Sequence, residues 1–328
     1  MVYLTYVGSF PLKKTYNNLI KATYDILSIP VDYPNYVQLD DMVHQFLHPI
    51  AKSGHGIILE DEKYTLNGKL SLPKDPIAID SLKILLEIKN NHPNKENIKG
   101  IKACITGPFT LSSQIMLKSS NNGFFGNTAL SDPLLVTEIA NIVSKIAENY
   151  YKMGADYITI DEPMLSIIIG RNILLNQYSD RKIIEIINQS LKNIICFKGI
   201  HVCGKISRRL SEILLQTDID ILDHEFKDNE SNFGVYKKSD FDEYDKKIGF
   251  SVASSKTIDV ESVSEIELML NKGFKTFGKE NILMVKPDCG FRGLNKKGNL
   301  KSEAYLSSIA KLKNIRLAID SLKQKKIL

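Results

Sequence analysis

Two hydrophobic patterns alternate along the chain. Short runs of consecutive apolar residues, rich in β-branched side chains, are typical of strands buried on both faces of a parallel sheet. Between them, apolar residues recur at the three- and four-residue spacing of amphipathic helices, as at 134–150, 183–194 and 306–319. The runs that predict strands lie at residues 2–7, 56–59, 101–106, 157–160, 194–202, 219–222, 248–252 and 282–285.

This alternation predicts the fold class. Eight strands alternating with helices over 328 residues favour a single (β/α)8 TIM barrel that comprises residues 1–328. A doubly wound open sheet is the alternative. No internal repeat and no Pro/Ser-rich linker divides the chain into two domains. We expect two excursions over the barrel mouth, at 33–56 and 226–247.

Composition narrows the class of protein. The chain is 43% hydrophobic and 25% charged, which is ordinary globular usage. A net charge of +5, mixed along the chain, gives no reason to expect a nucleic-acid partner. No apolar run reaches the roughly 18 to 20 residues of a membrane span. The first ten residues lack a signal peptide's basic segment, and four scattered cysteines do not suit a secreted disulfide scaffold, so we expect a cytoplasmic protein.

Polar residues concentrate at the carboxyl ends of the predicted strands, where a barrel of this kind carries its active site. They are Gly8-Ser9 after the first strand, Asp161-Glu162 after the fourth, His201 and Cys203 at the fifth, Asp223 to Glu225 after the sixth, Lys256 after the seventh and Asp288-Cys289 after the eighth.

His201 and Cys203 are two residues apart, so on a strand their side chains face the same side. Glu225 and Cys289 occupy equivalent strand ends. A set of one His, two Cys and one Glu suits tetrahedral Zn²⁺. The alternative is structural: a buried Cys203, a surface His201 and a turn around Cys289 that is chosen for its backbone shape.

Several motifs, taken together, resemble the catalytic half of cobalamin-independent methionine synthase. They occur in the family's order: Val7-Gly8-Ser9-Phe10-Pro11, Ile160-Asp161-Glu162-Pro163, Ile200-His201-Val202-Cys203, Asp223-His224-Glu225 and Pro287-Asp288-Cys289-Gly290. The resemblance implies a (β/α)8 barrel of the uroporphyrinogen-decarboxylase-like type and a zinc-dependent methyltransferase that makes methionine from homocysteine.

The resemblance also implies roles for individual residues. His201, Cys203, Glu225 and Cys289 match the zinc ligands. Gly8 and Ser9 match a turn that contacts homocysteine, and Asp161 matches the carboxylate that binds its amino group. Free thiols are mostly protonated at neutral pH, whereas Zn²⁺ deprotonates a bound thiol, so such a site would hold homocysteine sulfur as a nucleophile.

The chain departs from the family on the side of the methyl donor. Lys256 stands where the family has a proton-donating His, and Ile167 replaces a glutamate used for folate. The family's amine-binding glutamate has no clear match, and Asp40 or Asp41 could substitute for it. The chain thus resembles the short single-barrel archaeal enzymes, for which a methyl-corrinoid, free or on a partner protein, is the implied donor. Lys256 could bind an acidic group of donor or substrate, or could be an exposed loop residue.

Other functions remain open at this point. The acceptor could be another thiol, such as coenzyme M, although Asp161 favours an amino acid, and the donor could be methyl-tetrahydrofolate. A metal-free decarboxylase on this barrel should carry arginines near the N-terminus, yet no Arg precedes Arg171. A non-catalytic protein that binds homocysteine or a corrinoid is the last alternative.

Overall fold

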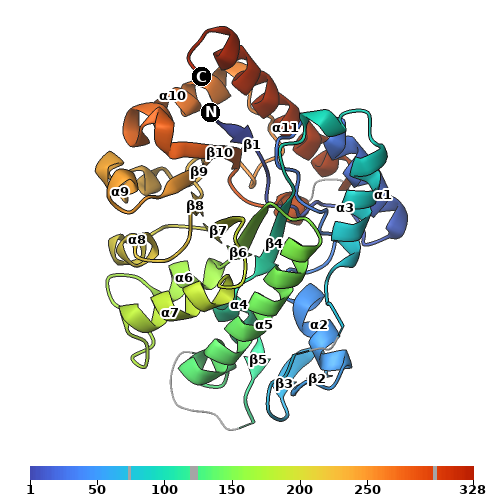
Figure 1. Ribbon diagram of the computed structural model, residues 1–328, viewed down its shortest axis with the longest axis vertical. Helices are drawn as coiled ribbons and strands as arrows, with labels where there is room; N and C mark the ends of the chain where they lie inside the picture. The colour runs from blue at the N-terminus through green and yellow to red at the C-terminus, as the bar shows by residue number, and fades with distance from the viewer. Residues whose placement is uncertain (73–74, 119–124, 298–300) are drawn as a thin grey trace.

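Seven parallel strands form the curled sheet at the centre of the molecule (Figure 1). The structure is a computed structural model that describes residues 1–72, 75–118, 125–297 and 301–328. The strands are adjacent in the order β1, β10, β9, β8, β7, β6, β4. Their bounds are β1 (Tyr3–Leu4), β4 (Lys102–Thr106), β6 (Tyr157–Asp161), β7 (Phe197–Val202), β8 (Ile221–His224), β9 (Lys247–Ala253) and β10 (Ile282–Pro287).

Residues 33–38 fill the remaining position in the barrel wall, between β1 and β4. The segment forms parallel bridges from Tyr33 to Thr5 and from Asn35 to Lys102. The Gln38 N–H donates to the Gly8 carbonyl at 2.9 Å. The predicted TIM-type barrel is therefore confirmed, but residues 33–38 belong to its wall and not to an excursion over the mouth.

The sequence predicted a barrel strand at 56–59, and this prediction is wrong. The run lies in β2 (Ile57–Glu60), which pairs antiparallel with β3 (Lys63–Leu66) in a separate small sheet completed by β5 (Ile115–Met116). Asp61 and Glu62 connect the two strands with φ angles of 47° and 62°, the left-handed backbone of a two-residue hairpin turn. Helix α2 (His44–Lys52) contacts β2. That residues 39–56 form an excursion over the barrel mouth stays a prediction.

Helices form the outer layer, and their local sequence explains several of their ends. Asp132 accepts a hydrogen bond from the Leu134 N–H at the start of α5, where Pro133 occupies the first turn. Ser262 and Glu265 form a capping box at the start of α10. The outer helices are α1 (Tyr16–Leu27), α3 (Asp80–Asn91), α5 (Pro133–Lys152), α7 (Asp180–Ser190), α8 (Arg208–Leu215), α9 (Lys238–Glu243), α10 (Val263–Phe277) and α11 (Lys301–Gln324).

Short helices and turns occupy the connections between these elements. Helix α4 (Pro108–Ser112) directly follows β4, and α6 (Pro163–Ile168) directly follows β6, so both begin at the carboxyl end of the sheet. The 3-10 turns are η1 (Lys95–Asn97), η2 (Ala129–Ser131), η3 (Glu230–Gly234), η4 (Lys279–Asn281) and η5 (Phe291–Lys297).

The predicted excursion at 226–247 covers most of the connection from β8 to β9 and the first residue of β9, and it has two parts. Its first residues reach the loop after β10, because the Lys227 and Asp228 N–H groups donate to Asp288. Its second part joins the outer layer, where Phe241 of α9 packs against Phe277 of α10 with ring centroids 5.9 Å apart. That this segment forms an excursion over the barrel mouth therefore stays a prediction for its first part only, the residues around Lys227 and Asp228.

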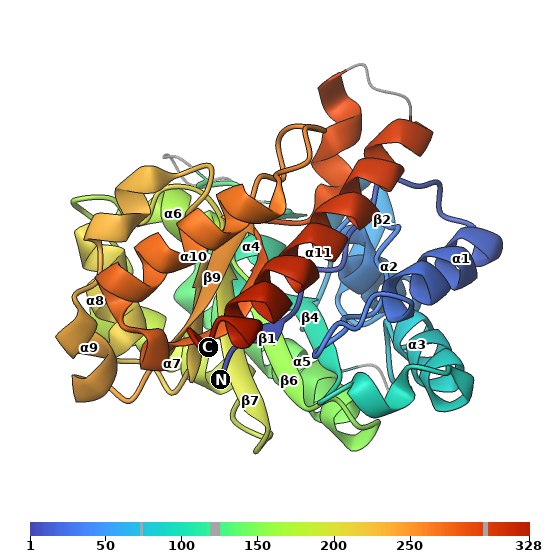
Figure 2. The ribbon, with the colours of Figure 1, turned by 90° about the horizontal axis from the view of Figure 1, so that it is seen from above.

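The barrel interior changes character along its axis. At the amino ends of the strands, the side chains of Tyr33, Tyr157, Ile221 and Met284 form a small apolar cluster. The carboxyl ends carry the polar side chains described below. The two chain termini lie side by side beside α10 and α11 (Figures 1 and 2). Among the described residues, no helix combines the length and the apolar character that crossing a membrane requires.

Candidate metal and substrate site

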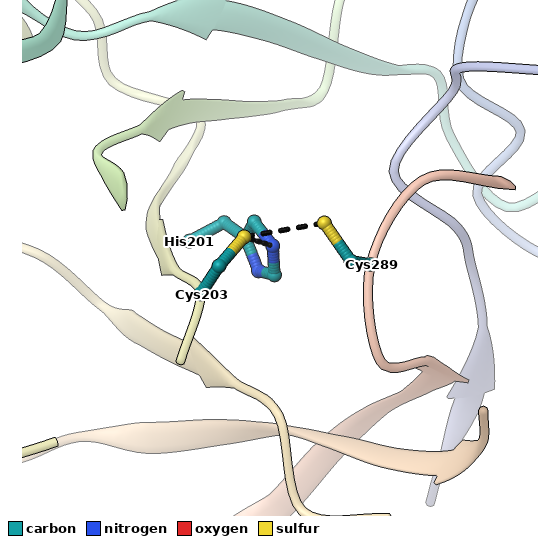
Figure 3. Close-up of side chains that lie close together, drawn as sticks. All are labelled: His201, Cys203 and Cys289. Carbon is teal, nitrogen blue, oxygen red and sulfur yellow. Dashed lines mark hydrogen bonds between the residues drawn. The ribbon is translucent and has the colours of Figure 1, made fainter. Parts of the chain in front are cut away.

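Three potential metal ligands meet at the carboxyl end of the barrel (Figure 3). The Cys203 Sγ lies 3.0 Å from His201 Nε2 and 3.2 Å from the Cys289 Sγ. One ligand atom from each residue lies within 4.8 Å of the other two. His201 is on β7, Cys203 directly follows that strand, and Cys289 follows β10. The strand spacing of His201 and Cys203 thus places both side chains on one side, as the sequence predicted.

His201 is held by a buried carboxylate on the next strand. Its Nδ1 lies 2.6 Å from Asp223 Oδ1, and Asp223 in turn lies 2.7 Å from the Lys286 ammonium. Burial lowers the pKa of His201, but Asp223 outweighs this effect and raises the pKa to about 10. Burial raises the pKa of Asp223, yet Lys286 and His201 together hold it below its ordinary value. The Nε2 atom of His201 is therefore the one directed at the two sulfurs.

The pKa values of the two cysteine thiols are shifted in opposite directions. The hydrogen bond with Cys203 lowers the pKa of Cys289 well below its ordinary value, against the effect of burial and with further help from His201. The pKa of Cys203 is raised by the same hydrogen bond and by burial. Either sulfur can donate the hydrogen bond that joins them, and the shifts in pKa favour ionisation at Cys289. Thiolates are the form in which cysteine binds metals.

Glu225, the fourth ligand implied by the resemblance, lies outside this cluster of three. Its carboxylate is buried, and its Oε2 accepts hydrogen bonds from the Lys256 ammonium at 3.3 Å and from the Asn229 amide. Lys256 also lies 3.9 Å from Asp228, and its side chain is about half exposed. The structure therefore pairs two of the predicted site residues, Glu225 and Lys256, with each other.

Asp161 ends β6 and is the register partner of His201 on β7. Its Oδ1 atom is buried and has no hydrogen-bond partner in the described part of the chain. Burial raises the pKa of this carboxyl to about 7, partly offset by His201 and Lys102. Its neighbour Glu162 serves a different purpose, since it accepts the N–H of Thr110 at 3.0 Å and anchors α4. Asp161 is thus a buried acceptor available to a ligand.

Gly8 and Ser9 form the turn after β1, beside the loop of Cys289. Gly8 has a φ of 120°, and a Cβ atom there would lie 2.7 Å from the Asn35 Nδ2. The Phe291 N–H donates to the Ser9 carbonyl at 2.9 Å. The turn after β1 and the loop after β10 are therefore directly connected, which brings the predicted substrate residues next to a predicted metal ligand.

Asp41 lies at the start of α2. It is exposed, and its Oδ1 accepts the N–H groups of Val43 and His44 at 2.9 and 3.1 Å. Asp40 pairs with Lys14 and accepts the N–H of Asp41. Asp41 is thus engaged at the beginning of this helix, whereas Asp40 pairs with Lys14. A role in substrate binding stays a prediction for Asp41.

Gln38 is a candidate that the sequence analysis missed. It forms a parallel bridge with Ser9, and its side chain is buried with only 5% of the residue exposed. Its Nε2 has no hydrogen-bond partner among the described residues. The signal in the sequence was a single polar residue within the short apolar segment 36–39. Unpartnered buried donors are rare, and Gln38 lines a pocket together with Lys14, Asp40 and His44, so this amide is available to a ligand there.

Fold and site together define a (β/α)8-barrel protein with a cysteine- and histidine-containing candidate metal centre. The chain belongs to the cobalamin-independent methionine synthase family: residues 86–312 match the family described as Cobalamin-independent synthase, Catalytic domain. Membership of this family indicates a methyltransferase.

Relatives of known name agree with this assignment. The methionine synthase of Methanocaldococcus jannaschii is 30% identical over 313 residues, which span 88% of this chain and 92% of the relative. The methionine synthase of Methanothermobacter thermautotrophicus is 30% identical over 282 residues, 85% of this chain and 80% of the relative. The resemblance to archaeal enzymes of this length is thus confirmed.

Solved structures confirm the fold. A B12-independent methionine synthase from Shewanella sp. W3-18-1, in complex with selenomethionine, superimposes with a TM-score of 0.69 at 16% identity, covering 100% of both chains. A methyltransferase from Methanosarcina mazei gives a TM-score of 0.54 at 14% identity, covering 97% of this chain and 94% of the other.

Proposed function

We propose that this chain is a zinc-dependent methyltransferase that methylates the sulfur of homocysteine and forms methionine. The observation that carries this proposal is the convergence of His201, Cys203 and Cys289, whose ligand atoms lie within 4.8 Å of one another at the carboxyl end of the barrel. The archaeal relatives are named methionine synthases, and this name supplies the substrate.

The donor set fits zinc. One imidazole nitrogen and two sulfurs form a borderline-soft set that favours Zn²⁺ over hard, oxygen-preferring cations. The lowered pKa of Cys289 favours the thiolate, which is the form that binds metals. Glu225 would complete four protein ligands after its carboxylate turns away from Lys256. Zn²⁺ at this site would lower the pKa of a bound thiol and so supply a thiolate at neutral pH.

The residues around the donor cluster suit the rest of homocysteine. Asp161 offers a buried, unpartnered carboxylate oxygen to the ammonium group. Ser9, whose Oγ lies against Gly290 in the loop of Cys289, offers a hydroxyl to the carboxylate. Methyl transfer forms one C–S bond and breaks the bond between the methyl carbon and the donor, which keeps the electron pair. The protein contributes mainly by positioning the two reactants.

A methyl-corrinoid, free or bound to a partner protein, is the donor that we propose. A folate leaving group needs a proton, and Lys256 is a weak acid near neutral pH because a lysine ammonium has a pKa of about 10.4. Its ammonium also lies 3.9 Å from Asp228, a carboxylate that would stay beside it after Glu225 turned to the metal. Ile167 of α6 is 52% exposed, so an apolar surface occupies the place where the family uses a glutamate for folate. A reduced corrinoid leaves without a proton.

Zinc analysis combined with a methyl-transfer assay tests the proposal. Purified protein should bind one zinc per chain and convert homocysteine to methionine with methylcobalamin, and only slowly with monoglutamyl methyl-tetrahydrofolate. Faster turnover with the folate would overturn the donor assignment while leaving the reaction intact. Preference for coenzyme M over homocysteine would assign another thiol acceptor. Protein without zinc and without turnover on any donor would contradict the proposed function.

A further inference from the structure

Two lysines lie inside the barrel directly below the candidate metal centre. The side chains of Lys102 on β4 and Lys286 on β10 are both 0% exposed. Barrel interiors are usually filled by branched apolar side chains, and burial of an ammonium group is costly unless it is paired. Two buried lysines whose ammonium groups both approach Asp223 therefore need a specific explanation.

Lys286 uses its whole hydrogen-bonding capacity around the site. Its Nζ lies 2.7 Å from Asp223 Oδ1 and donates to the carbonyl oxygens of Pro287 at 3.0 Å and Asp288 at 2.8 Å. An ammonium group has three donors, and each has a partner here. One contact leads through Asp223 to the Nδ1 of His201, and the other two hold the backbone immediately before Cys289.

The contact between Asp223 and Lys286 spans an intervening strand. The sheet order places β9 between β8, which carries Asp223, and β10, which carries Lys286. Position 249 of β9 is the register partner of Asp223 and is a glycine. A Cβ atom at Gly249 would lie 3.0 Å from the Asp223 Cβ, so a side chain at that position would crowd the carboxylate. The missing side chain leaves room for Asp223 and Lys286 to meet.

Lys102 provides a natural comparison. Its Nζ lies 3.9 Å from Asp223 Oδ2 and has no hydrogen-bond partner within the described ranges. It lies 5.1 Å from the centre of the Tyr157 ring. Lys102 thus adds positive charge near Asp223, whereas Lys286 also holds the loop of Cys289.

We propose that Lys286 is a positioning residue that fixes His201 and Cys289 relative to each other, so that the affinity of the site for its metal depends on this buried ammonium group. The inference rests on the zinc site of the proposed function. It adds a residue that contacts neither metal nor substrate and acts through Asp223 on one side and through the backbone before Cys289 on the other.

Metal affinity measured against a chromophoric chelator tests this role in Lys286→Met, which keeps the length and removes the charge. Groups that orient metal ligands typically contribute roughly 10- to 100-fold to metal affinity, and we expect a loss in this range for Zn²⁺. Substitution by Co²⁺ adds a spectroscopic readout, because the thiolate-to-cobalt absorption bands should weaken or shift when Cys289 moves. Neither measurement requires turnover.

Two matched variants separate positioning from general loss of a buried charge. Lys102→Met removes the other ammonium near Asp223 and should retain most of the Zn²⁺ affinity and the Co²⁺ spectrum. Lys311→Met removes a fully buried lysine that pairs with Glu261 at 2.7 Å, outside the site. It should lower the melting temperature and leave Zn²⁺ affinity unchanged.

The double variant Asp223→Asn/Lys286→Met covers the case in which Lys286→Met does not fold. It removes both charges of the pair, so no unpaired carboxylate remains buried, and residue 223 keeps an acceptor for His201. Its Zn²⁺ affinity should still be reduced, because the backbone before Cys289 is no longer held. Wild-type affinity and Co²⁺ bands in either Lys286 variant, or an equal loss of affinity in Lys311→Met, would overturn the inference. Wild-type protein that binds no zinc would instead contradict the proposed function.

Discussion

Gly290 lies against Ser9, and a Cβ atom added to this glycine would be 1.9 Å from the Ser9 Oγ. The two residues belong to loops that follow the neighbouring strands β10 and β1. The contact therefore joins the turn proposed to bind homocysteine to the loop that carries Cys289. Only a residue without a side chain at position 290 allows the Ser9 hydroxyl to keep its place.

Gly290→Ala should raise the KM for homocysteine, because the added methyl group turns the Ser9 hydroxyl aside. One hydrogen bond contributes about 0.5–1.5 kcal/mol, which corresponds to a roughly two- to tenfold increase in KM. Gly293→Ala is the matched control, since a Cβ at Gly293 has no atom within 4 Å. Steady-state kinetics at wild-type zinc content measure the effect. Equal KM values in the two variants would show that Ser9 does not contact the substrate.

Cys289→Ser should lose zinc and activity together, because it removes one of the two sulfurs of the candidate metal centre. Elemental analysis and the methyl-transfer assay measure both losses. Cys196→Ser is the control: Cys196 directly precedes β7, at the opposite end of that strand from Cys203. It should retain full zinc and turnover. A Cys289→Ser protein with wild-type zinc and turnover would remove the basis of the metal assignment.

The sequence predicted those parts of the fold that have a strong apolar pattern. Seven of its apolar runs are strands of the central sheet, and the spacing of His201 and Cys203 was enough to place both on one side of β7. The wall segment 33–38 escaped prediction because it contains Pro34, Asn35 and Gln38 and forms only isolated bridges. The run at 56–59 has the apolar pattern of a barrel strand. Only the turn at Asp61 and Glu62, which pairs it antiparallel with β3, distinguishes it from one.

The sequence revealed less about which polar residues meet. No spacing rule connects Glu225 with Lys256, which are 31 residues apart and pair through space. Asp41 stays a predicted substrate ligand, and no pattern in the sequence indicated that its Oδ1 accepts N–H groups at the start of α2. Lys102 and Lys286 look like ordinary charged residues in the sequence. Their burial follows from the barrel's closure, which brings distant strands around a common interior.

Asp161→Asn should weaken the recognition of the substrate's ammonium group while preserving the shape of the site. A hydrogen bond to a charged group contributes about 1.5–3 kcal/mol, so the KM for homocysteine should rise roughly 10- to 100-fold. The thiol 4-mercaptobutanoate, which lacks the amino group, is the diagnostic substrate. Wild-type enzyme should strongly prefer homocysteine, and the variant should lose most of that preference. If the ratio of kcat/KM for the two thiols were the same in Asp161→Asn as in the wild type, another residue would bind the amino group.

Glu162 gives the protein a pH-dependent stability that Glu162→Gln should remove. Burial raises the pKa of this carboxyl from 4.5 to about 8, although Thr110 and the Phe109 N–H donate hydrogen bonds to it. The folded state therefore holds the proton more tightly than the unfolded state does. The free energy of unfolding of the wild type should fall as the pH rises from about 5 to about 8, and level off above that range.

Urea unfolding of both proteins across this pH range measures the effect. The difference in unfolding free energy, wild type minus Glu162→Gln, should decrease with pH by an amount on the order of several kcal/mol. The glutamine cannot accept hydrogen bonds at both of its terminal atoms, which lowers the variant's stability equally at every pH and leaves the slope as the informative quantity. If the unfolding free energies of the two proteins ran parallel with pH, the three donated hydrogen bonds would keep Glu162 ionised in the folded protein. Burial would then have the weaker influence on its pKa.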